Sequence, residues 1–244
     1  MKYDTLQDPR SVLVIGGSGG IGGALAQEFS GAGWRVALHY HTHRDAAEKC
    51  AASLASTPLL CRADVRRPSE VETLLSEVVH AYGRLDAMIY AAGAASSRLL
   101  LRLSGDEWAQ VLDVNATGAF HCLRAAGSHM TARRRGSIVL VGSFAGLQGA
   151  IGQAAYAASK AALIGLVRSA AREWAEANVR VNLALPGWHR TALSQQSMPE
   201  AGEFDDHLLG APPALADVAR MIRHVTELPA VSGQIWNLDS RLLP

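Results

Sequence analysis

The chain has 244 residues, of which 49% are hydrophobic and 18% charged, with 23 basic against 22 acidic side chains. This balance gives no field that would recruit nucleic acid or an anionic membrane surface, so we expect a small molecule as partner. The apolar runs fall short of the ~20 residues that span a bilayer, and the polar start lacks the apolar core of a signal peptide, which predicts a cytoplasmic protein. Cys50, Cys61 and Cys122 form no C-x-x-C pair, so we expect reduced thiols, no disulfide and no metal site.

A glycine-rich turn follows the first predicted strand, Ser11–Ile15, and precedes a helical pattern over residues 24–29. This order is typical of a dinucleotide site, because small residues let the backbone approach a pyrophosphate and the helix offers its positive amino end. Ordinary tight turns also use glycine, but the flanking strand and helix favour the phosphate interpretation. The cofactor contacts predicted here are Gly16, Ser18, Gly20, Ile21 and Gly22.

The second predicted strand, Arg35–Tyr40, ends in a basic turn with three histidines and an arginine. Selection of NAD usually needs an acid here for the ribose 2′-hydroxyl, whereas a basic residue suits the 2′-phosphate of NADP. No acid occurs in residues 33–44, so the turn predicts NADPH as cofactor, with a solvated, unused turn as the open alternative. A metal cluster is disfavoured because no carboxylate or cysteine is paired with the histidines. The contacts predicted here are His41, Thr42 and Arg44.

Asp45 and Glu48 predict a capping box for the next helix. A third strand is predicted over residues 58–61, and Asp64 and Val65 lie at its end. There the carboxylate could meet an adenine and the valine could cover it, or Asp64 could simply cap a turn.

Strands and helices then alternate with short links as far as residue 238. One strand, residues 86–90, runs into small residues where a cofactor would pass, so Ala92 and Gly93 are predicted contacts. Residues 192–213 have no regular pattern and predict a mobile lid. The alternation predicts an α/β Rossmann-like, doubly wound parallel sheet with helices on both faces. We expect a single domain over residues 1–244, with a cofactor half at about 11–143 and a catalytic and lid half at about 143–244.

The segment from Ser143 to Lys160 carries the predicted chemistry. Tyr156 and Lys160 are four residues apart in an alanine-rich helical pattern, so their side chains share one face. The ammonium should lower the phenol pKa toward the working range, so that Tyr156 can give a proton to a carbonyl oxygen or take one from an alcohol. Ser143 follows the apolar run of residues 138–141, at the edge where open α/β sheets bind ligands. Its hydroxyl could hold the same oxygen.

Asn115 lies inside a long predicted helical stretch, residues 103–135. A buried amide needs partners, so Asn115 is either a satisfied structural group or part of a proton path.

From residue 12 to residue 239 the sequence resembles a short-chain dehydrogenase/reductase of the plain type. The resemblance implies that the catalytic residues are Asn115, Ser143, Tyr156 and Lys160. It also implies that Tyr156 and Lys160 contact the cofactor, and that the segment holding the nicotinamide contributes Pro186, Gly187, His189 and Thr191.

Four positions depart from the family pattern. Ile15 replaces the usual threonine, and Tyr90 and Ala91 replace two asparagines, so hydrogen bonds between the central strands must be replaced or lost. Gly19 stands where many NADP-dependent members carry a basic residue, which leaves phosphate selection to residues 41–44.

Gln153 and the start of the lid most resemble 3-oxoacyl-[acyl-carrier-protein] reductases. This implies reduction of a keto group, best a 3-oxoacyl thioester on acyl carrier protein or CoA, with Ser143, Gln153 and Tyr156 contacting the substrate. A sugar, polyol or secondary-alcohol dehydrogenase and a non-catalytic dinucleotide sensor are the alternatives, the second disfavoured by the complete catalytic set. Residues 133–135, three arginines, are either a carrier docking site or a solvated helix end. Family pairing of helices predicts a homodimer or homotetramer.

Overall fold

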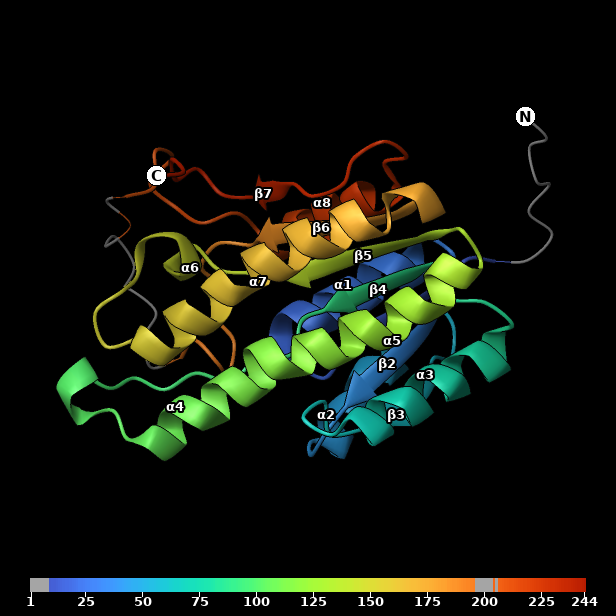
Figure 1. Ribbon diagram of the computed structural model, residues 1–244, viewed down its shortest axis with the longest axis horizontal. Helices are drawn as coiled ribbons and strands as arrows, with labels where there is room; N and C mark the ends of the chain where they lie inside the picture. Colours follow the sequence, from blue (N-terminus) through green and yellow to red (C-terminus); the bar gives the residue numbers. More distant parts are fainter. Residues whose placement is uncertain (1–8, 196–203, 205) are drawn as a thin grey trace.

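A computed structural model of the protein describes residues 9–195, 204 and 206–244 (Figure 1). At its centre lies a seven-stranded sheet in the order β3-β2-β1-β4-β5-β6-β7, and every neighbouring pair is parallel. The strands are β1 Ser11–Ile15, β2 Arg35–Tyr40, β3 Leu59–Arg62, β4 Ala87–Tyr90, β5 Gly136–Val141, β6 Val179–Leu185 and β7 Ile235–Asn237. The predicted α/β class and parallel sheet are confirmed.

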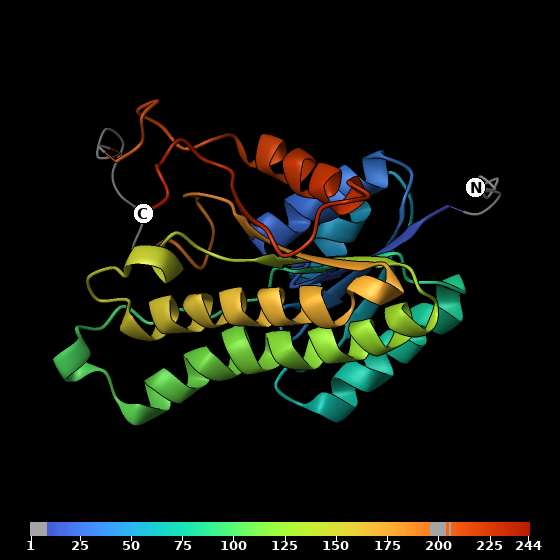
Figure 2. The ribbon, with the colours of Figure 1, turned by 45° about the horizontal axis from the view of Figure 1, so that its top comes forward.

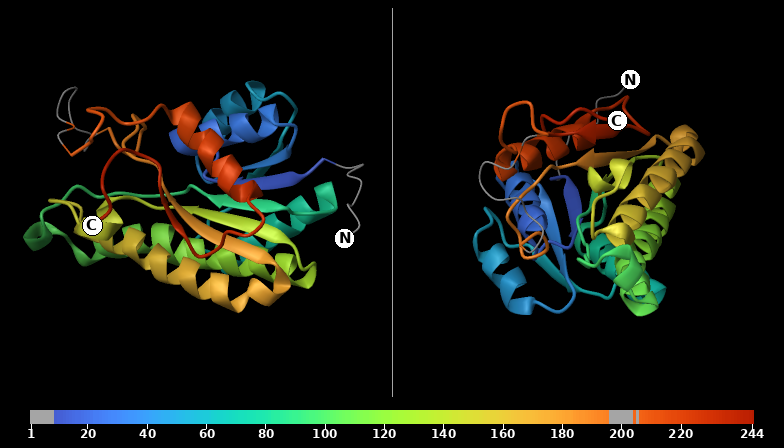
Figure 3. Two further views of the ribbon diagram at one scale, coloured as in Figure 1. Left: turned by 90° about the horizontal axis from the view of Figure 1, so that it is seen from above. Right: turned by 90° about the vertical axis from the view of Figure 1, so that its left-hand side faces the viewer.

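Helices cover both faces of this sheet, as Figures 2 and 3 show. Helices α1, α2 and α8 supply buried residues to the core on one face, and α3, α5 and α7 supply those on the other. The helices are α1 Gly20–Gly31, α2 Arg44–Ala52, α3 Pro68–Tyr82, α4 Gly105–Leu112, α5 Gly118–Ala132, α6 Ala145–Gln148, α7 Ala154–Glu173 and α8 Leu215–Glu227, with short turns η1 Leu100–Arg102, η2 Asp113–Thr117 and η3 Ala175–Ala177.

The strands are apolar along both faces because both faces are covered. In β1, Leu13 and Ile15 belong to one core and Val12 and Val14 to the other, as the alternation of side chains along a strand requires. Such runs were recognisable in the sequence, and three predicted strands have the observed limits: β1, β2 and β6.

The predicted capping box of Asp45 and Glu48 is wrong. Helix α2 begins at Arg44, so Asp45 lies inside its first turn, and Glu48 accepts a 2.7 Å hydrogen bond from Arg44 Nε. A capping box instead starts α4, where Ser104 and Glu107 bond each other's backbone N–H groups.

The long predicted helical stretch consists of α4 and α5, joined by η2, a π-helical turn. A π turn adds one residue to the helix without ending it, and such turns occur often at functional sites. Asn115 is the buried residue of this turn.

The strand order reverses between β1 and β4, which is where ligands bind in doubly wound sheets. The register aligns the carboxyl ends of the central strands, with Ile15 opposite Tyr90 and Tyr90 opposite Leu140. The segments that follow β1, β4, β5 and β6 therefore meet at one edge of the sheet.

The predicted lid, residues 192–213, falls partly on residues 196–203 and 205, which lie outside the described residues. Its described residues form turns and contain neither helix nor strand. Within the described ranges, the search for a helix with the length and hydropathy of a bilayer span found none.

Candidate active site

A cavity of about 460 Å³ lies at this edge of the sheet. Its wall is built by Ala91 to Gly93 after β4, Ser143 after β5, the segment after β6, and the first two turns of α7. Among the residues predicted from the sequence, it brings together Ile21, Ala92, Gly93, Ser143, Gln153, Tyr156, Lys160, Pro186, Gly187, His189 and Thr191.

Ser143 and Tyr156 both line this cavity. Burial raises the pKa of the Tyr156 phenol, and the Ser143 hydrogen bond opposes that rise. The net shift of the Tyr156 pKa is therefore upward, against the expected fall, because burial outweighs what lowers it. Lys160 Nζ donates to the Val141 carbonyl at 2.8 Å and lies 5.7 Å from the centre of the Tyr156 ring.

Lys160 is itself buried, with 4% of its surface exposed, and burial lowers its pKa to about 8. Its ammonium holds the last carbonyl of β5, which leaves further donors of the same group for the cavity. The cavity wall thus carries the hydroxyls of Ser143 and Tyr156 and the buried ammonium of Lys160.

Asn115 is a satisfied structural group, one of the two alternatives open from the sequence. Its Oδ1 accepts from Ala94 N at 2.7 Å, and its Nδ2 donates to Ala94 O and to Ser159 Oγ, both at 2.9 Å. It nevertheless lies close to the cavity wall, because a side-chain carbon added to Gly93 would be 3.5 Å from Asn115 Oδ1 and 4.0 Å from Lys160 Nζ.

Tyr90 stands where the family pattern has an asparagine, and it forms a different hydrogen bond. Its ring is fully buried, and its hydroxyl donates to the Val114 carbonyl at 2.5 Å, beside Asn115 in the π turn. Gly118 makes room for it, since a side-chain carbon at Gly118 would lie 2.8 Å from the Tyr90 oxygen. The lost hydrogen bond is therefore replaced by one from β4 to the π turn.

Removing this tie should destabilise the fold. We expect Tyr90→Phe to lower the free energy of unfolding by about 1–3 kcal/mol, because the Val114 carbonyl stays buried without its partner. Urea unfolding of wild type and variant would measure this change. A variant as stable as wild type would show that the π turn does not depend on this hydroxyl.

The glycine turn after β1 has the shape that a pyrophosphate needs. Gly16 has φ +79°, and a side-chain carbon at Gly22 would lie 2.1 Å from Gly16 O. Helix α1 starts without a side-chain cap among the described residues, so its first N–H groups are open to an anion. Thr191 lies against the same turn, because a side-chain carbon at Gly20 would meet its Cγ2 at 2.5 Å. These features fit a dinucleotide.

His39, which no motif indicated, fastens this turn. Gly16 N–H donates to His39 Nδ1 at 3.1 Å, and His39 Nε2–H donates to Ala63 O at 3.0 Å, so the buried ring is neutral and its tautomer is defined. His39 thereby joins the ends of β1, β2 and β3. The chain lacks the threonine and the asparagines of the family pattern, and His39 supplies hydrogen bonds in this region instead. Burial lowers its pKa from 6.5 to about 4.

The depressed pKa of His39 makes stability depend on pH. Above pH 6.5 the ring is neutral in both states, and between 6.5 and about 4 only the unfolded chain takes up its proton, so stability falls as pH falls through that window. We expect a loss of about 2 kcal/mol from this group between pH 7 and pH 5. Urea unfolding at both pH values, with His39→Asn as control, tests this. An equal pH dependence in the variant would remove His39 as its source.

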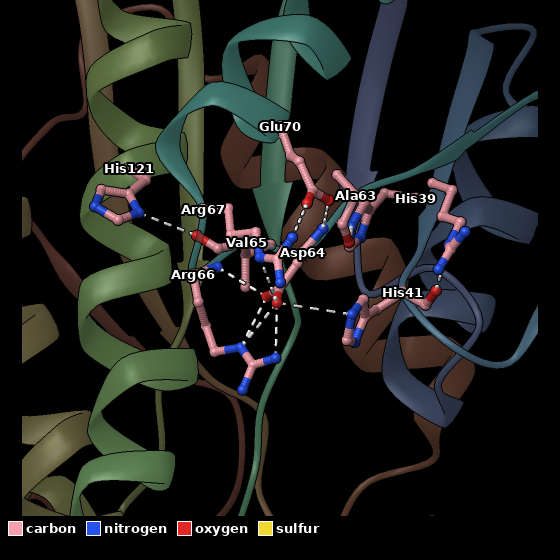
Figure 4. A network of polar contacts seen from close by, with 10 residues as sticks. His39, His41, Ala63, Asp64, Val65, Arg66, Arg67, Glu70 and His121 are labelled. Atoms are coloured by element: carbon pink, nitrogen blue, oxygen red, sulfur yellow. Dashed lines mark hydrogen bonds and ion pairs between the residues drawn. The ribbon is translucent and has the colours of Figure 1, made fainter.

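Beyond His39 lies a network centred on Asp64 (Figure 4). Arg66 binds the Asp64 carboxylate through Nε and Nη2 at 2.8 and 2.7 Å, and His41 Nε2 approaches it to 3.8 Å. The Arg66 hydrogen bonds hold the pKa of Asp64 down at about 2. The sequence predicts three phosphate contacts in the turn after β2. His41 belongs to the Asp64 network, Thr42 is exposed, and the Arg44 side chain donates a hydrogen bond to Glu48.

Arg241 also borders the cavity, although no sequence motif singled it out. Its guanidinium lies 4.1 Å from the centre of the Phe144 ring and binds Asp239 Oδ2 at 2.6 and 2.8 Å. Asp239 in turn abuts Gly187, whose φ is +84°, since a side-chain carbon there would lie 2.9 Å from the carboxylate. Only the folded chain brings these distant positions together.

The three arginines of residues 133–135 lie at the start of β5, whereas the cavity lies at its end, about 17 Å away for a strand of this length. Arg133 donates to Gly83 O, and Arg134 donates to Glu176 O. A carrier docked there would be remote from the cavity of the same chain.

Comparisons with known proteins agree on the class of fold. A family model described as short chain dehydrogenase matches residues 10–202. The chain is 36% identical over 182 residues to the 3-oxoacyl-[acyl-carrier-protein] reductase FabG of Staphylococcus aureus, covering 73% of this chain and 74% of that one. It is 30% identical over 236 residues to the 3-oxoacyl-[acyl-carrier-protein] reductase of Synechocystis sp., covering 95% and 96%. A crystal structure named ribose-5-phosphate isomerase from Brucella melitensis is similar with a TM-score of 0.88 and 27% identity, covering 96% of this chain and 92% of that one.

Proposed function

Because the chain belongs to the short-chain dehydrogenase family, we propose that it is an NADPH-dependent reductase that converts a 3-oxoacyl thioester to the 3-hydroxy form. The observation that carries this proposal is that Ser143 and Tyr156 line one cavity together with the buried Lys160 ammonium. We propose acyl carrier protein or CoA as the bearer of the thioester, because the two curated relatives are named as reductases of the carrier-bound substrate.

The protonation state of Tyr156 supports its role as a proton donor. Burial raises its pKa, so the phenol keeps its proton at neutral pH and is ready to donate it. A keto oxygen that accepts hydrogen bonds from Ser143 and Tyr156 is polarised and then protonated by the Tyr156 hydroxyl as negative charge develops. Lys160 stabilises the phenolate that remains, because an ammonium nearby in a desolvated site favours that anion.

The nicotinamide dinucleotide that this family uses supplies the hydride when bound. We propose that the glycine turn and the start of α1 hold its pyrophosphate, with Asp64 and Val65 at the adenine. Ala92, Gly93, Pro186, Gly187, His189 and Thr191 would border the nicotinamide, and Lys160 its ribose. Preference for NADPH rests on the absence of an acid at the end of β2 and the basic side chains beyond it.

The direct test is an absorbance assay of NADPH and NADH oxidation with a 3-oxoacyl thioester, run beside a panel of sugars, polyols and secondary alcohols with the oxidised cofactors. We expect turnover of the thioester with NADPH. Turnover confined to sugars or polyols would replace the reductase proposal by the dehydrogenase alternative. Dinucleotide binding without turnover of any compound would instead favour a sensor.

Oligomeric state and location are further proposals. In α7, Leu163 and Val167 face the core, while Ile164 and Leu166 are only partly buried, so the helix has apolar surface left for a partner copy. We propose a homodimer or homotetramer, which sedimentation at micromolar concentration would test. A cytoplasmic location is proposed from the three free cysteines.

A further inference from the structure

We propose that Arg66 is the residue that recognises the adenosine 2′-phosphate, with the Asp64 carboxylate holding its guanidinium in position. This inference rests on the proposed function to the extent that the chain must bind a nicotinamide dinucleotide. It assigns phosphate selection to the turn after β3, whereas the sequence pointed to the turn after β2.

The first argument is the orientation of the guanidinium. Asp64 binds one edge of it, through Nε at 2.8 Å and Nη2 at 2.7 Å, and also accepts from Arg66 N at 3.1 Å. Asp64 is buried, with 8% of its side chain exposed, whereas Arg66 is 43% exposed. The opposite edge, Nη1 and the second hydrogen of Nη2, forms no hydrogen bond with any residue that the structure describes. A planar fork held on one side by a carboxylate presents its other side to a phosphate without losing rotamer freedom on binding.

The second argument is position. His41 is the first residue after β2, the strand whose end meets the adenosine ribose in dinucleotide-binding folds. His41 Nε2 lies 3.8 Å from Asp64 Oδ2, and Arg66 Nη2 lies 2.7 Å from the same oxygen. Figure 4 shows the two side chains approaching the carboxylate from different sides. The free edge of Arg66 is therefore within reach of a group attached to the ribose.

The third argument is that each neighbouring arginine either binds a carboxylate or is not held in one orientation by an acid. Arg44 donates to Glu48 and has Asp45 beside it, while Arg67 donates to Glu70. Arg62 donates through Nε to the His41 carbonyl and forms no ion pair with a carboxylate in the described part of the chain, so its exposed side chain is not pre-oriented by an acid. Arg66 also lies in the field of Asp113, so its unengaged edge, and not a net positive charge, is what favours a phosphate there.

The experiment compares the dissociation constants of NADPH, NADH, and the fragments 2′,5′-ADP and 5′-AMP for the full-length wild type and three variants, by calorimetry or fluorescence. We expect Arg66→Gln to weaken NADPH and 2′,5′-ADP by about tenfold or more, as for the loss of a charge-assisted hydrogen-bonded pair. NADH and 5′-AMP should change by less than about threefold. Arg62→Gln, the matched control, should change NADPH affinity by less than about threefold.

Arg66→Lys separates recognition from charge alone. The lysine keeps the charge but loses the fork, so we expect NADPH affinity between those of wild type and Arg66→Gln, with thermal melting reporting that each variant is folded. Equal weakening of NADPH and NADH in Arg66→Gln would overturn the proposal, because it would show a general role in shaping the adenosine site. A larger NADPH loss in Arg62→Gln would also overturn it. Wild type that binds neither dinucleotide would refute the proposed function itself.

Discussion

Tyr156→Phe is expected to lower turnover of the keto substrate by about 10²–10⁴-fold, the contribution of a positioned proton donor. The change removes only the hydroxyl, and the ring that borders the cavity remains. The dissociation constant of NADPH should therefore stay within about a factor of three. Steady-state assays and a fluorescence titration of the cofactor measure the two effects separately.

Tyr82→Phe is the matched control for this result. Tyr82 also has a buried, hydrogen-bonded hydroxyl, which donates to Val36 O at 2.8 Å and lies at the opposite end of β2 from the cavity. Its loss should reduce stability and leave the turnover number unchanged. If Tyr156→Phe retained turnover within a few-fold of wild type, Tyr156 would not be the proton donor.

Gly22→Ala should abolish dinucleotide binding, raising the dissociation constant by more than about 100-fold, and should lower thermal stability. The added carbon would lie 2.1 Å from Gly16 O and 2.8 Å from Gly16 C, so backbone must move at the turn proposed to hold the pyrophosphate. No side-chain rotation can relieve this contact, because the three nearest atoms all belong to the backbone.

Gly23→Ala, at the next residue of α1, should be tolerated. Its added carbon would meet Cys50 Sγ at 3.6 Å and Gly17 O at 3.7 Å, both ordinary contacts, and alanine favours a helix over glycine by about 0.5–1 kcal/mol. Cofactor titration and thermal melting of both variants would test the pair. Similar behaviour of the two variants would mean that the close approach of α1 to Gly16 does not govern binding.

The amino-acid sequence by itself determined the features that depend on local pattern. Apolar runs bounded by turn residues located β1, β2 and β6, the glycine spacing marked the turn before α1, and the four-residue step from Tyr156 to Lys160 placed both on one face of α7. These predictions succeed because strand alternation, helix periodicity and glycine's freedom are set by neighbours along the chain.

Only the tertiary structure decided which groups meet across the sheet edge and how deeply they are buried. The contacts of His39 with Gly16 and Ala63, and of Tyr90 with Val114, join residues 23 or 24 positions apart, and no spacing rule predicts them. The direction of the Tyr156 pKa shift was mistaken in the sequence-based prediction, because the ammonium was counted and the desolvation was not. Strand order sets these neighbours and burial sets the charge states, and both exist only once the chain has folded.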